Sequence, residues 1–486
     1  MATERELLQR LTDMMATYLE ENFDPETKVV DYVPAKEVHE LMDFKIQSEG
    51  QDYEQFFKHI ETYLKHAVRT RHPQFWNQLW SGYTFPSLLA QFVTALTNTS
   101  MFTYEMAPLA TMMELEIINK LGNYIGWENA EGQLATGGSN ANMIAMLAAR
   151  DWKLAHTREQ GLTAVNKALR VYVSDQAHYS FSRGMQLLGL GTNNLVEIQS
   201  EPNGKMIPEA LHDAIRADKA AGHLPFFVSA TAGTTVLGAF DPIETIADIA
   251  EQAGLWLYMD AAWGGAAMLS PKHTHLVKGS HRARSATWNP HKTMGMHLPC
   301  SVILFRDVGT MGSSCGSGST EYIFHEYENE AYDMGPQSLQ CGRQVDALKL
   351  WLTWKLYGSD QYAKRTEHCF AQTQHAVEFI NKHPRLHLMR DPEYLNVVLQ
   401  YVPESAKPGP HLNQLNEAAR NSLVQSGDSM VNFSFLKDGN FIFRPVFASA
   451  EKTFEDVELM LNNIVKHGDK MAKAMATTTA RRATAQ

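Results

Sequence analysis

The sequence predicts an α/β protein whose main domain is built on a mostly parallel sheet. From about residue 90 to 350, short apolar runs typical of strands alternate with longer helical patterns, as a parallel sheet with crossover helices requires. Several of these runs end on polar or glycine-rich turns, and open α/β sheets bind ligands at such strand ends. After residue 351 the order changes: helical patterns precede three strand-like runs, which indicates a small α+β domain.

Composition limits the classes of function. The 486 residues are enough for two or three domains, and a hydrophobic content of 44% is ample for a large core. The net charge of −11 argues against nucleic acid or an anionic membrane surface as the main partner, although a few local cations can still bind an acidic ligand. Four scattered cysteines predict neither a disulfide framework nor a metal site. The charged start of the chain lacks the apolar core of a signal peptide, and no apolar run is long enough for a membrane span, so we expect a cytoplasmic protein.

The first 89 residues are predicted to form a helical segment. Apolar residues recur with the helical period over residues 4–21 and again over residues 56–68. Each apolar stripe needs a surface to cover it, which either the same chain or a second copy could supply.

A large domain is expected over residues 90–350. Its helical patterns include residues 142–156 and 243–252. The apolar runs that predict strands are residues 170–174, 226–230, 255–260 and 301–305.

A small domain is expected over residues 351–486. It is predicted to begin with helices over residues 351–364 and 368–383 and to end with a helix that starts near residue 454. Its strand-like runs are residues 397–402, 430–435 and 440–447, and the tail from residue 476 onward is expected to fray.

Two residues stand out as a chemical pair. Asp260 ends a short apolar run, and Lys292 follows a histidine in a segment with few other charges. Pyridoxal phosphate (PLP) needs such a pair, since a lysine amine bonds its aldehyde and a carboxylate keeps its ring nitrogen protonated. Burial of the lysine would lower its pKa and favour the neutral nucleophile. Either residue alone is more often structural, so the prediction depends on finding both.

Two further segments fit the same cofactor. Residues 136–142, which read Thr-Gly-Gly-Ser-Asn-Ala-Asn, stand directly before a helical pattern, where free N–H groups favour a phosphate, although such a segment is also typical of a plain helix cap. His178 follows a predicted strand, where an imidazole could lie on an aromatic ring and assist proton transfer.

Taken together, several stretches make the chain resemble the group II PLP-dependent amino-acid decarboxylases, and within them the glutamate and cysteine sulfinate decarboxylases. The resemblance runs from about residue 70 to 450 and so covers most of the chain; it includes His72–Leu79, Thr103–Pro108, Ala230–Thr235, Tyr258–Trp263, Thr287–Lys292 and Gln340–Arg343. It implies the aspartate-aminotransferase-like fold (fold type I of PLP enzymes), a homodimer wrapped by the N-terminal segment, and phosphate binding at Gly138, Ser139 and Asn140.

The resemblance also implies roles for single residues. His178 would stack on the cofactor ring and Ala262 would pack on its opposite face. Arg444, inside an apolar strand, and Gln78 would bind the acidic substrate. Residues expected near the cofactor for their hydroxyl groups or their position next to Lys292 are Thr231, Thr234 and His291.

A loop before Gln340 departs from the family pattern. Animal members carry there a tyrosine that protonates the substrate carbon after carbon dioxide leaves, whereas here the loop is shorter and its alignment is ambiguous. Tyr327 is the first candidate for this proton donor and Tyr332 the second.

The expected reaction is the α-decarboxylation of a short acidic amino acid. Ser100 matches the cysteine sulfinate enzymes, where glutamate decarboxylases have asparagine, and Trp80 replaces their phenylalanine with a larger wall. Both favour cysteine sulfinate or aspartate over glutamate, although one methylene is worth only about 1–3 kcal/mol. A glutamate decarboxylase, a PLP aminotransferase and a catalytically silent scaffold are the alternatives.

Overall fold

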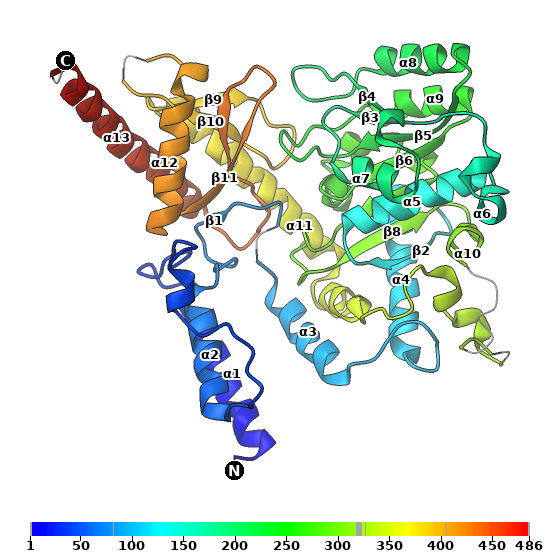
Figure 1. Cartoon of the computed structure of the whole chain (residues 1–486), viewed down its shortest axis with the longest axis horizontal. Coiled ribbons are helices and arrows are strands. Elements are labelled where there is room, and N and C mark those ends of the chain that lie inside the picture. The colour runs from blue at the N-terminus through cyan, green and yellow to red at the C-terminus, as the bar shows by residue number, and fades with distance from the viewer. Residues whose placement is uncertain (1, 81, 317–322, 326, 405, 485–486) are drawn as a thin grey trace.

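The structure is a computed structural model that describes residues 2–80, 82–316, 323–325, 327–404 and 406–484 of the chain. Figure 1 shows two sheet-containing parts, a large one in green and cyan and a small one in orange and yellow, with helix α11 running from one to the other. Among the described residues, no helix is long and apolar enough to cross a membrane.

The large domain is built on a seven-stranded sheet in the order β2-β8-β7-β6-β5-β3-β4. Strands β4, β3, β5, β6 and β7 run parallel, and β8 is antiparallel to both β7 and β2, so the mostly parallel sheet is confirmed. The strands are β2 Glu131–Ala135, β3 Leu169–Ser174, β4 Leu195–Ile198, β5 Leu224–Thr231, β6 Trp256–Ala261, β7 Ser285–Trp288 and β8 Ser301–Phe305. Four of them match predicted strands, whereas β2, β4 and β7 were not predicted.

Helices cover both faces of this sheet. Alternate residues of β3 point to opposite sides: Val171 and Val173 belong to one apolar core, and Tyr172 belongs to the other. The helices are α4 Pro108–Ile125, α5 Gly138–Lys153, α6 Thr157–Gln160, α7 Ser180–Leu187, α8 Pro208–Ala220, α9 Ile243–Ala253 and α10 Thr310–Cys315. Because the central strands are parallel, the carboxyl ends of β3, β5, β6 and β7 meet along one edge.

The small domain contains a five-stranded sheet in the order β1-β11-β12-β10-β9. Its strands are β1 Phe75–Trp76, β9 Leu386–Arg390, β10 Val398–Tyr401, β11 Met430–Phe435 and β12 Phe441–Arg444, and its helices are α11 Asp346–Lys382, α12 Asn413–Ser426 and α13 Phe454–Thr484. The two helices predicted over residues 351–383 form one element with a break at Gly358, whose φ of 67° is left-handed. The tail was predicted to fray, but α13 continues in helical conformation to Thr484.

The N-terminal segment contains α1 Glu4–Glu21, α2 Tyr53–His66 and α3 Phe85–Thr97. Helices α1 and α2 lie side by side, joined by the ion pair of Arg10 with Glu54, and they project from the rest of the chain (Figure 1). Strand β1 of this segment pairs with β11, so residues 75–76 belong to the small-domain sheet. The predicted boundaries at residues 89/90 and 350/351 fall inside α3 and α11, and the division into these segments stays a prediction.

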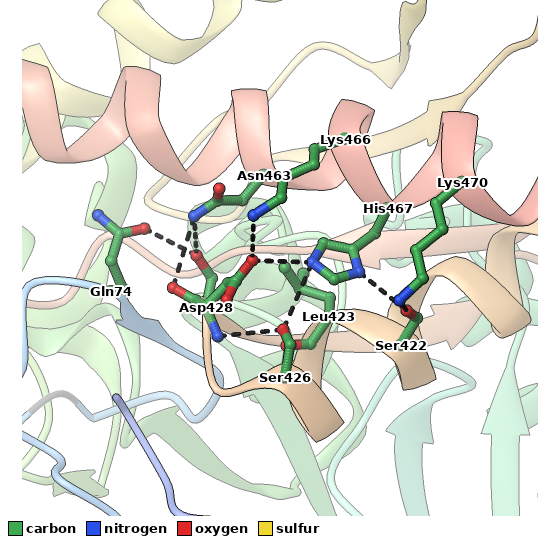
Figure 2. A network of polar contacts seen from close by, with 10 residues as sticks. Gln74, Ser422, Leu423, Ser426, Asp428, Asn463, Lys466, His467 and Lys470 are labelled. Atoms are coloured by element: carbon green, nitrogen blue, oxygen red, sulfur yellow. Dashed lines mark hydrogen bonds and ion pairs between the residues drawn. The ribbon is translucent and has the colours of Figure 1, made fainter. Parts of the chain in front are cut away.

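A buried polar network joins α12, α13 and the turn between α12 and β11 (Figure 2). His467 is 2% exposed; its Nε2 lies 3.0 Å from Asp428 Oδ2, and its Nδ1 lies 2.9 Å from Ser422 Oγ. Lys466 also pairs with the Asp428 carboxylate. Burial lowers the pKa of His467 from its ordinary 6.5, with Asp428 opposing and the nearby lysines adding to the shift.

Acid is therefore expected to weaken this contact. Because the folded state binds a proton on His467 less readily than the unfolded chain, stability is present above pH 6.5 and is lost as the pH falls below it. Thermal unfolding measured between pH 8 and 5 should show this loss. The His467→Gln variant, which cannot titrate, should lose less stability over that range; an unchanged pH dependence would show that another group is responsible.

Candidate active site

A cavity lies at the carboxyl ends of β3, β5, β6 and β7, where an open α/β sheet is expected to bind its ligand. Its empty space of about 570 Å³ includes the solvent at its open mouth. Its wall is formed by Gly138, Ser139, Asn142, Gln176, His178, Thr231, Gly233, Thr235, Asp260, Ala262, Trp263, Asn289 and Lys292. Seven of the predicted site residues are thus brought together from five separate segments of the chain.

Lys292 reaches the cavity from the turn after β7. The strand ends at Trp288, and the amide of Lys292 donates a hydrogen bond of 2.9 Å to the carbonyl of Asn289. Burial lowers the pKa of Lys292 to about 8, with Asp260 opposing and Arg444 adding to the shift. A substantial fraction of the amine is therefore neutral near physiological pH and able to act as a nucleophile.

Asp260 is held rigidly at the end of β6. Its Oδ1 accepts a hydrogen bond of 3.1 Å from the amide of Ala262, and its Oδ2 accepts one of 3.1 Å from Asn142 Nδ2. Asn142 in turn accepts a hydrogen bond from the hydroxyl of Tyr258, which fixes the orientation of its side-chain amide. The carboxylate is 5% exposed and faces the cavity with its orientation set from both sides.

His178 is connected to the same network. Its Nδ1 lies 2.9 Å from Ser180 Oγ, and that hydroxyl accepts a hydrogen bond from Asn142 Nδ2. Burial lowers the pKa of His178, with Lys292 adding to the shift and Asp260 opposing it. The ring is therefore neutral at physiological pH, which suits stacking on an aromatic ligand.

The start of α5 forms an anion-binding end of the cavity. Gly138 begins the helix, and the first N–H groups of a helix have no partner within it. A Cβ at Gly138 would lie 2.8 Å from Asn289 Nδ2, so a side chain there would crowd the wall. Two buried oxygens of the wall, Thr231 Oγ1 and Asn289 Oδ1, have no hydrogen-bond partner within the described ranges. The N–H groups of the helix start and the Thr231 hydroxyl are donors that fit a phosphorylated cofactor, whereas the Asn289 oxygen can only accept a hydrogen bond.

Arg444 approaches from β12 of the small domain. It is 5% exposed, its Nη1 donates a hydrogen bond of 2.6 Å to the carbonyl of Thr235, and no carboxylate of the described chain forms an ion pair with it. Burial lowers the pKa of Arg444 to about 10, so the guanidinium stays charged. A buried cation next to Thr235 of the cavity wall is suited to binding an anionic ligand.

Three predicted cofactor contacts are not among the residues of the wall. Thr234 is buried and its hydroxyl accepts a hydrogen bond from the amide of Ala239, as a structural turn requires. His291 is buried, with Nδ1 2.7 Å from the carbonyl of Cys300, and burial lowers its pKa to about 3. Asn140 lies in the first turn of α5, where its backbone rather than its side chain is positioned for an anion. Their contacts with the cofactor stay predictions.

The predicted substrate residues are not part of the cavity wall within one chain. Gln78 is exposed, and the Trp80 ring packs 5.8 Å from that of Phe75. The Ser100 hydroxyl accepts a hydrogen bond of 3.2 Å from the amide of Arg343.

The two loop tyrosines also lie away from the wall. The Tyr327 hydroxyl donates a hydrogen bond of 2.7 Å to Asp333 Oδ1, and the Tyr332 ring packs 5.5 Å from that of Tyr104. Desolvation and the Asp333 carboxylate raise the pKa of Tyr327 to about 12. Six residues of the preceding loop, 317–322, and residue 326 lie outside the described residues.

Several wall residues were not predicted. They are Asn142, Gln176, Gly233, Thr235, Trp263 and Asn289. Gln176 lies two residues before His178, and Asn289 lies three residues before Lys292. Their positions just after strands could therefore have indicated that Gln176 and Asn289 line the site. Asn142 lies inside α5, where only its contact with a residue 118 positions away reveals a role.

The seven-stranded sheet and a cavity that joins a lysine, a carboxylate and a helix N-terminus define a PLP-dependent enzyme of fold type I. The model of the family described as "Pyridoxal-dependent decarboxylase conserved domain" matches residues 34–402. The chain belongs to this family and is a PLP-dependent amino-acid decarboxylase.

Relatives within the family agree with this assignment. Cysteine sulfinic acid decarboxylase from Mus musculus is 37% identical over 446 residues, which cover 90% of each chain. Glutamate decarboxylase from Drosophila melanogaster is 37% identical over 478 residues, covering 96% of this chain and 94% of its own. The crystal structure of mouse CSAD superposes with a TM-score of 0.92 at 36% identity, covering 95% of this chain and 98% of that chain.

Proposed function

We propose that the enzyme releases carbon dioxide from a short acidic amino acid, with cysteine sulfinate or aspartate preferred to glutamate. The observation that carries the proposal is Arg444, a buried cation that has no carboxylate partner in the described chain and adjoins the cavity of Lys292. An acidic substrate would supply the missing anion. The names of the relatives, which act on cysteine sulfinate, glutamate or acidic amino acids, support the same substrate class.

In this proposal each predicted cofactor residue has a defined task. Bound PLP supplies an electron sink for the bond that breaks at the substrate α-carbon. Lys292 would bond the cofactor aldehyde, and Asp260 would keep its ring nitrogen protonated. His178 and Ala262 would pack on the two faces of the ring. The phosphate would be held by the start of α5, through Gly138, Ser139 and Asn140, together with Thr231, Thr234 and His291.

The proton that replaces carbon dioxide is assigned to Tyr327, with Tyr332 as the second candidate. With a pKa of about 12, Tyr327 keeps its proton at physiological pH and can deliver it to a strongly basic carbon. The Tyr327→Phe variant should still bind substrate but should lose turnover. The Tyr332→Phe variant should keep both substrate binding and turnover.

We further propose that a second copy of the chain completes the site. Helix α1 buries none of its residues, and α2 buries only Phe57. Large apolar side chains are exposed on four helices: Leu8 on α1; Tyr53, Phe56 and Tyr63 on α2; Leu89, Phe92, Val93 and Leu96 on α3; and Leu109 and Met112 on α4. Such faces need a partner, and they flank the segment that carries Gln78, Trp80 and Ser100. Sedimentation velocity of the purified protein should show a dimer.

A competition assay tests the substrate. The purified protein with added PLP is given cysteine sulfinate, aspartate and glutamate together, and carbon dioxide and each amine are quantified. We expect hypotaurine or β-alanine to dominate. Dominance of γ-aminobutyrate would refute the role given to Ser100 and Trp80, and a keto acid formed without carbon dioxide would indicate an aminotransferase.

Replacing Arg444 by lysine should raise KM for the acidic substrate by about 10- to 100-fold, because losing a charge-assisted hydrogen bond costs about 1.5–3 kcal/mol. Steady-state kinetics measure the change. Arg385→Lys is the matched control, since Arg385 pairs with Asp469 elsewhere in the small domain. Equal KM values for the two variants would remove Arg444 from the substrate site.

A further inference from the structure

A polar cluster connects the small domain to the turn that carries His178. Lys437 lies in the hairpin between β11 and β12, and its Nζ is 2.5 Å from Asp175 Oδ2 and 2.9 Å from Ser200 Oγ. Asp175 directly follows β3, and Ser200 follows β4. A single small-domain lysine therefore joins the ends of two large-domain strands.

The Asp175 carboxylate is the centre of this cluster. Besides Lys437, it accepts hydrogen bonds of 2.7 Å from Ser200 Oγ and 3.0 Å from Gln176 Nε2. Burial alone would raise its pKa, but these hydrogen bonds outweigh burial and hold the pKa of Asp175 below its ordinary value. The carboxylate is consequently charged, and it links Lys437 to a residue of the cavity wall, Gln176.

The position of Lys437 is well defined because the tip of its hairpin is held by further contacts. The amide of Leu436 donates to the carbonyl of Asn440, and Arg390 pairs with Asp438. A groove runs beside the hairpin, and Gln176 lines both this groove and the cofactor cavity. Gln176 therefore borders both the cavity and the groove, and its side chain is held by the hydrogen bond to Asp175.

The same domain boundary also carries Arg444. This residue donates to the carbonyl of Thr235, and Asn396 Nδ2 donates to the same carbonyl at 3.0 Å. The small domain thus contacts the cavity wall on two sides, at Thr235 through Arg444 and Asn396, and at Gln176 through Lys437 and Asp175. An anionic ligand can contact both Arg444 and the cavity of Lys292 only while these contacts hold the two domains in this arrangement.

We propose that Lys437 is a positioning residue, whose ion pair with Asp175 holds the small domain and the residue 175–178 turn in the arrangement that binds substrate. Without this ion pair, only a fraction of the molecules would have the arrangement that binds substrate. The apparent affinity for substrate would then be the intrinsic affinity multiplied by that fraction, while kcat at saturating substrate would be unchanged. A half-exposed ion pair is a weak contact, and an apolar cluster of Leu436 with Val236 and Leu237 also crosses the boundary. We therefore expect Lys437→Met to raise KM about 3- to 5-fold and to change kcat less than twofold.

The matched control is Lys466→Met. Lys466 is also exposed and pairs with a carboxylate, Asp428, at 2.7 Å, but both partners lie within the small domain. Lys437→Arg keeps the charge and should restore the wild-type KM. If the pair acts as a unit, the double variant Asp175→Asn/Lys437→Met should bind substrate no worse than the poorer single variant.

A second readout does not depend on the substrate. The inference rests on the proposed function only for the KM measurement, whereas the rate at which phenylhydrazine captures the lysine-bound cofactor reports the openness of the cavity directly. Lys437→Met should speed this capture about threefold, and Lys437→Arg and Lys466→Met should leave it at the wild-type rate. If no acidic amino acid is turned over by the wild type, the proposed function fails while the capture rates still decide the role of Lys437.

The outcomes separate positioning from a general structural role. An increase in KM and in capture rate for Lys437→Met alone, with thermal stability close to wild type, supports the proposal. Values for Lys437→Met equal to those of Lys466→Met in both assays would overturn it, as would a capture rate that follows the loss of thermal stability in every variant.

Discussion

Replacing Lys292 by alanine is expected to lower kcat by at least about 10³-fold, because the enzyme would lose the amine proposed to bond the cofactor. Lys292→Arg should be equally inactive, since a guanidinium keeps its proton and cannot act as a nucleophile. Carbon dioxide release measures the loss. The absorbance of the lysine-bound cofactor should disappear from both variants.

Two comparisons make this result specific to the amine. A small amine such as methylamine, added to Lys292→Ala, should restore part of the activity because the truncated side chain leaves room for it, and Lys292→Arg should not respond. Lys466→Met, which removes an exposed lysine of α13, should keep wild-type kcat. Activity of Lys292→Ala within tenfold of wild type would show that another lysine carries the cofactor.

The pairing of Asp260 with Lys292 was predicted from the chemistry that PLP requires, not from the strands that carry the two residues. Asp260 is the fifth residue of β6, and Lys292 is four residues beyond the end of β7, a strand that was not predicted. The structure brings the pair into one cavity because these neighbouring parallel strands end at one edge. His178, after β3, and Gly138, at the start of α5, follow the same rule.

Asn142 and Gln176 were missed because their roles arise only in the folded chain. Asn142 stands among apolar residues of α5, and its partners Asp260 and Tyr258 are more than a hundred residues away. Gln176 looks like an ordinary turn residue until Asp175 binds the distant Lys437. Polar residues whose partners are distant in sequence leave no periodic signal.

Strand β2 was missed for a different reason. Its sequence from Glu131 to Ala135 contains two polar residues and a glycine, yet every residue is buried. The Glu131 carboxylate is satisfied by the amide of Met311 across the fold, so tertiary contacts override the low strand propensity. Gly132 lies so close to β8 that a Cβ would meet the carbonyl of Ile303.

Ser100 and Trp80 were predicted to form the substrate wall, and within one chain they contact Arg343 and Phe75 instead. Both flank α3, whose exposed apolar side chains would be covered by a second copy in the dimer proposed above. A residue whose function depends on a partner subunit can be predicted from resemblance alone, because neither its own sequence context nor its contacts within the chain indicate that function.

Replacing Asp260 by asparagine is the second change expected to have a large effect, with kcat falling by about 10³-fold, near 4 kcal/mol of lost electrostatic stabilisation. An amide is neutral and cannot keep the ring nitrogen protonated, so the electron sink weakens. The new amide would also face two donors, the Ala262 amide and Asn142 Nδ2, which now donate to the carboxylate. Asn142 cannot turn over without losing the hydrogen bond that it accepts from Tyr258.

The cofactor should nevertheless remain bound in Asp260→Asn, because Lys292 and the start of α5 are untouched. Retained absorbance of the lysine-bound cofactor together with a lost kcat would locate the defect in the chemistry rather than in binding. Asp218→Asn is the matched control: Asp218 pairs with Arg170 and Tyr172 next to the same sheet but lies outside the cavity wall, so that variant should keep its activity. If Asp260→Asn kept its cofactor and lost less than tenfold in kcat, the carboxylate would be a structural group that orients Asn142, and the source of the ring proton would have to be sought elsewhere.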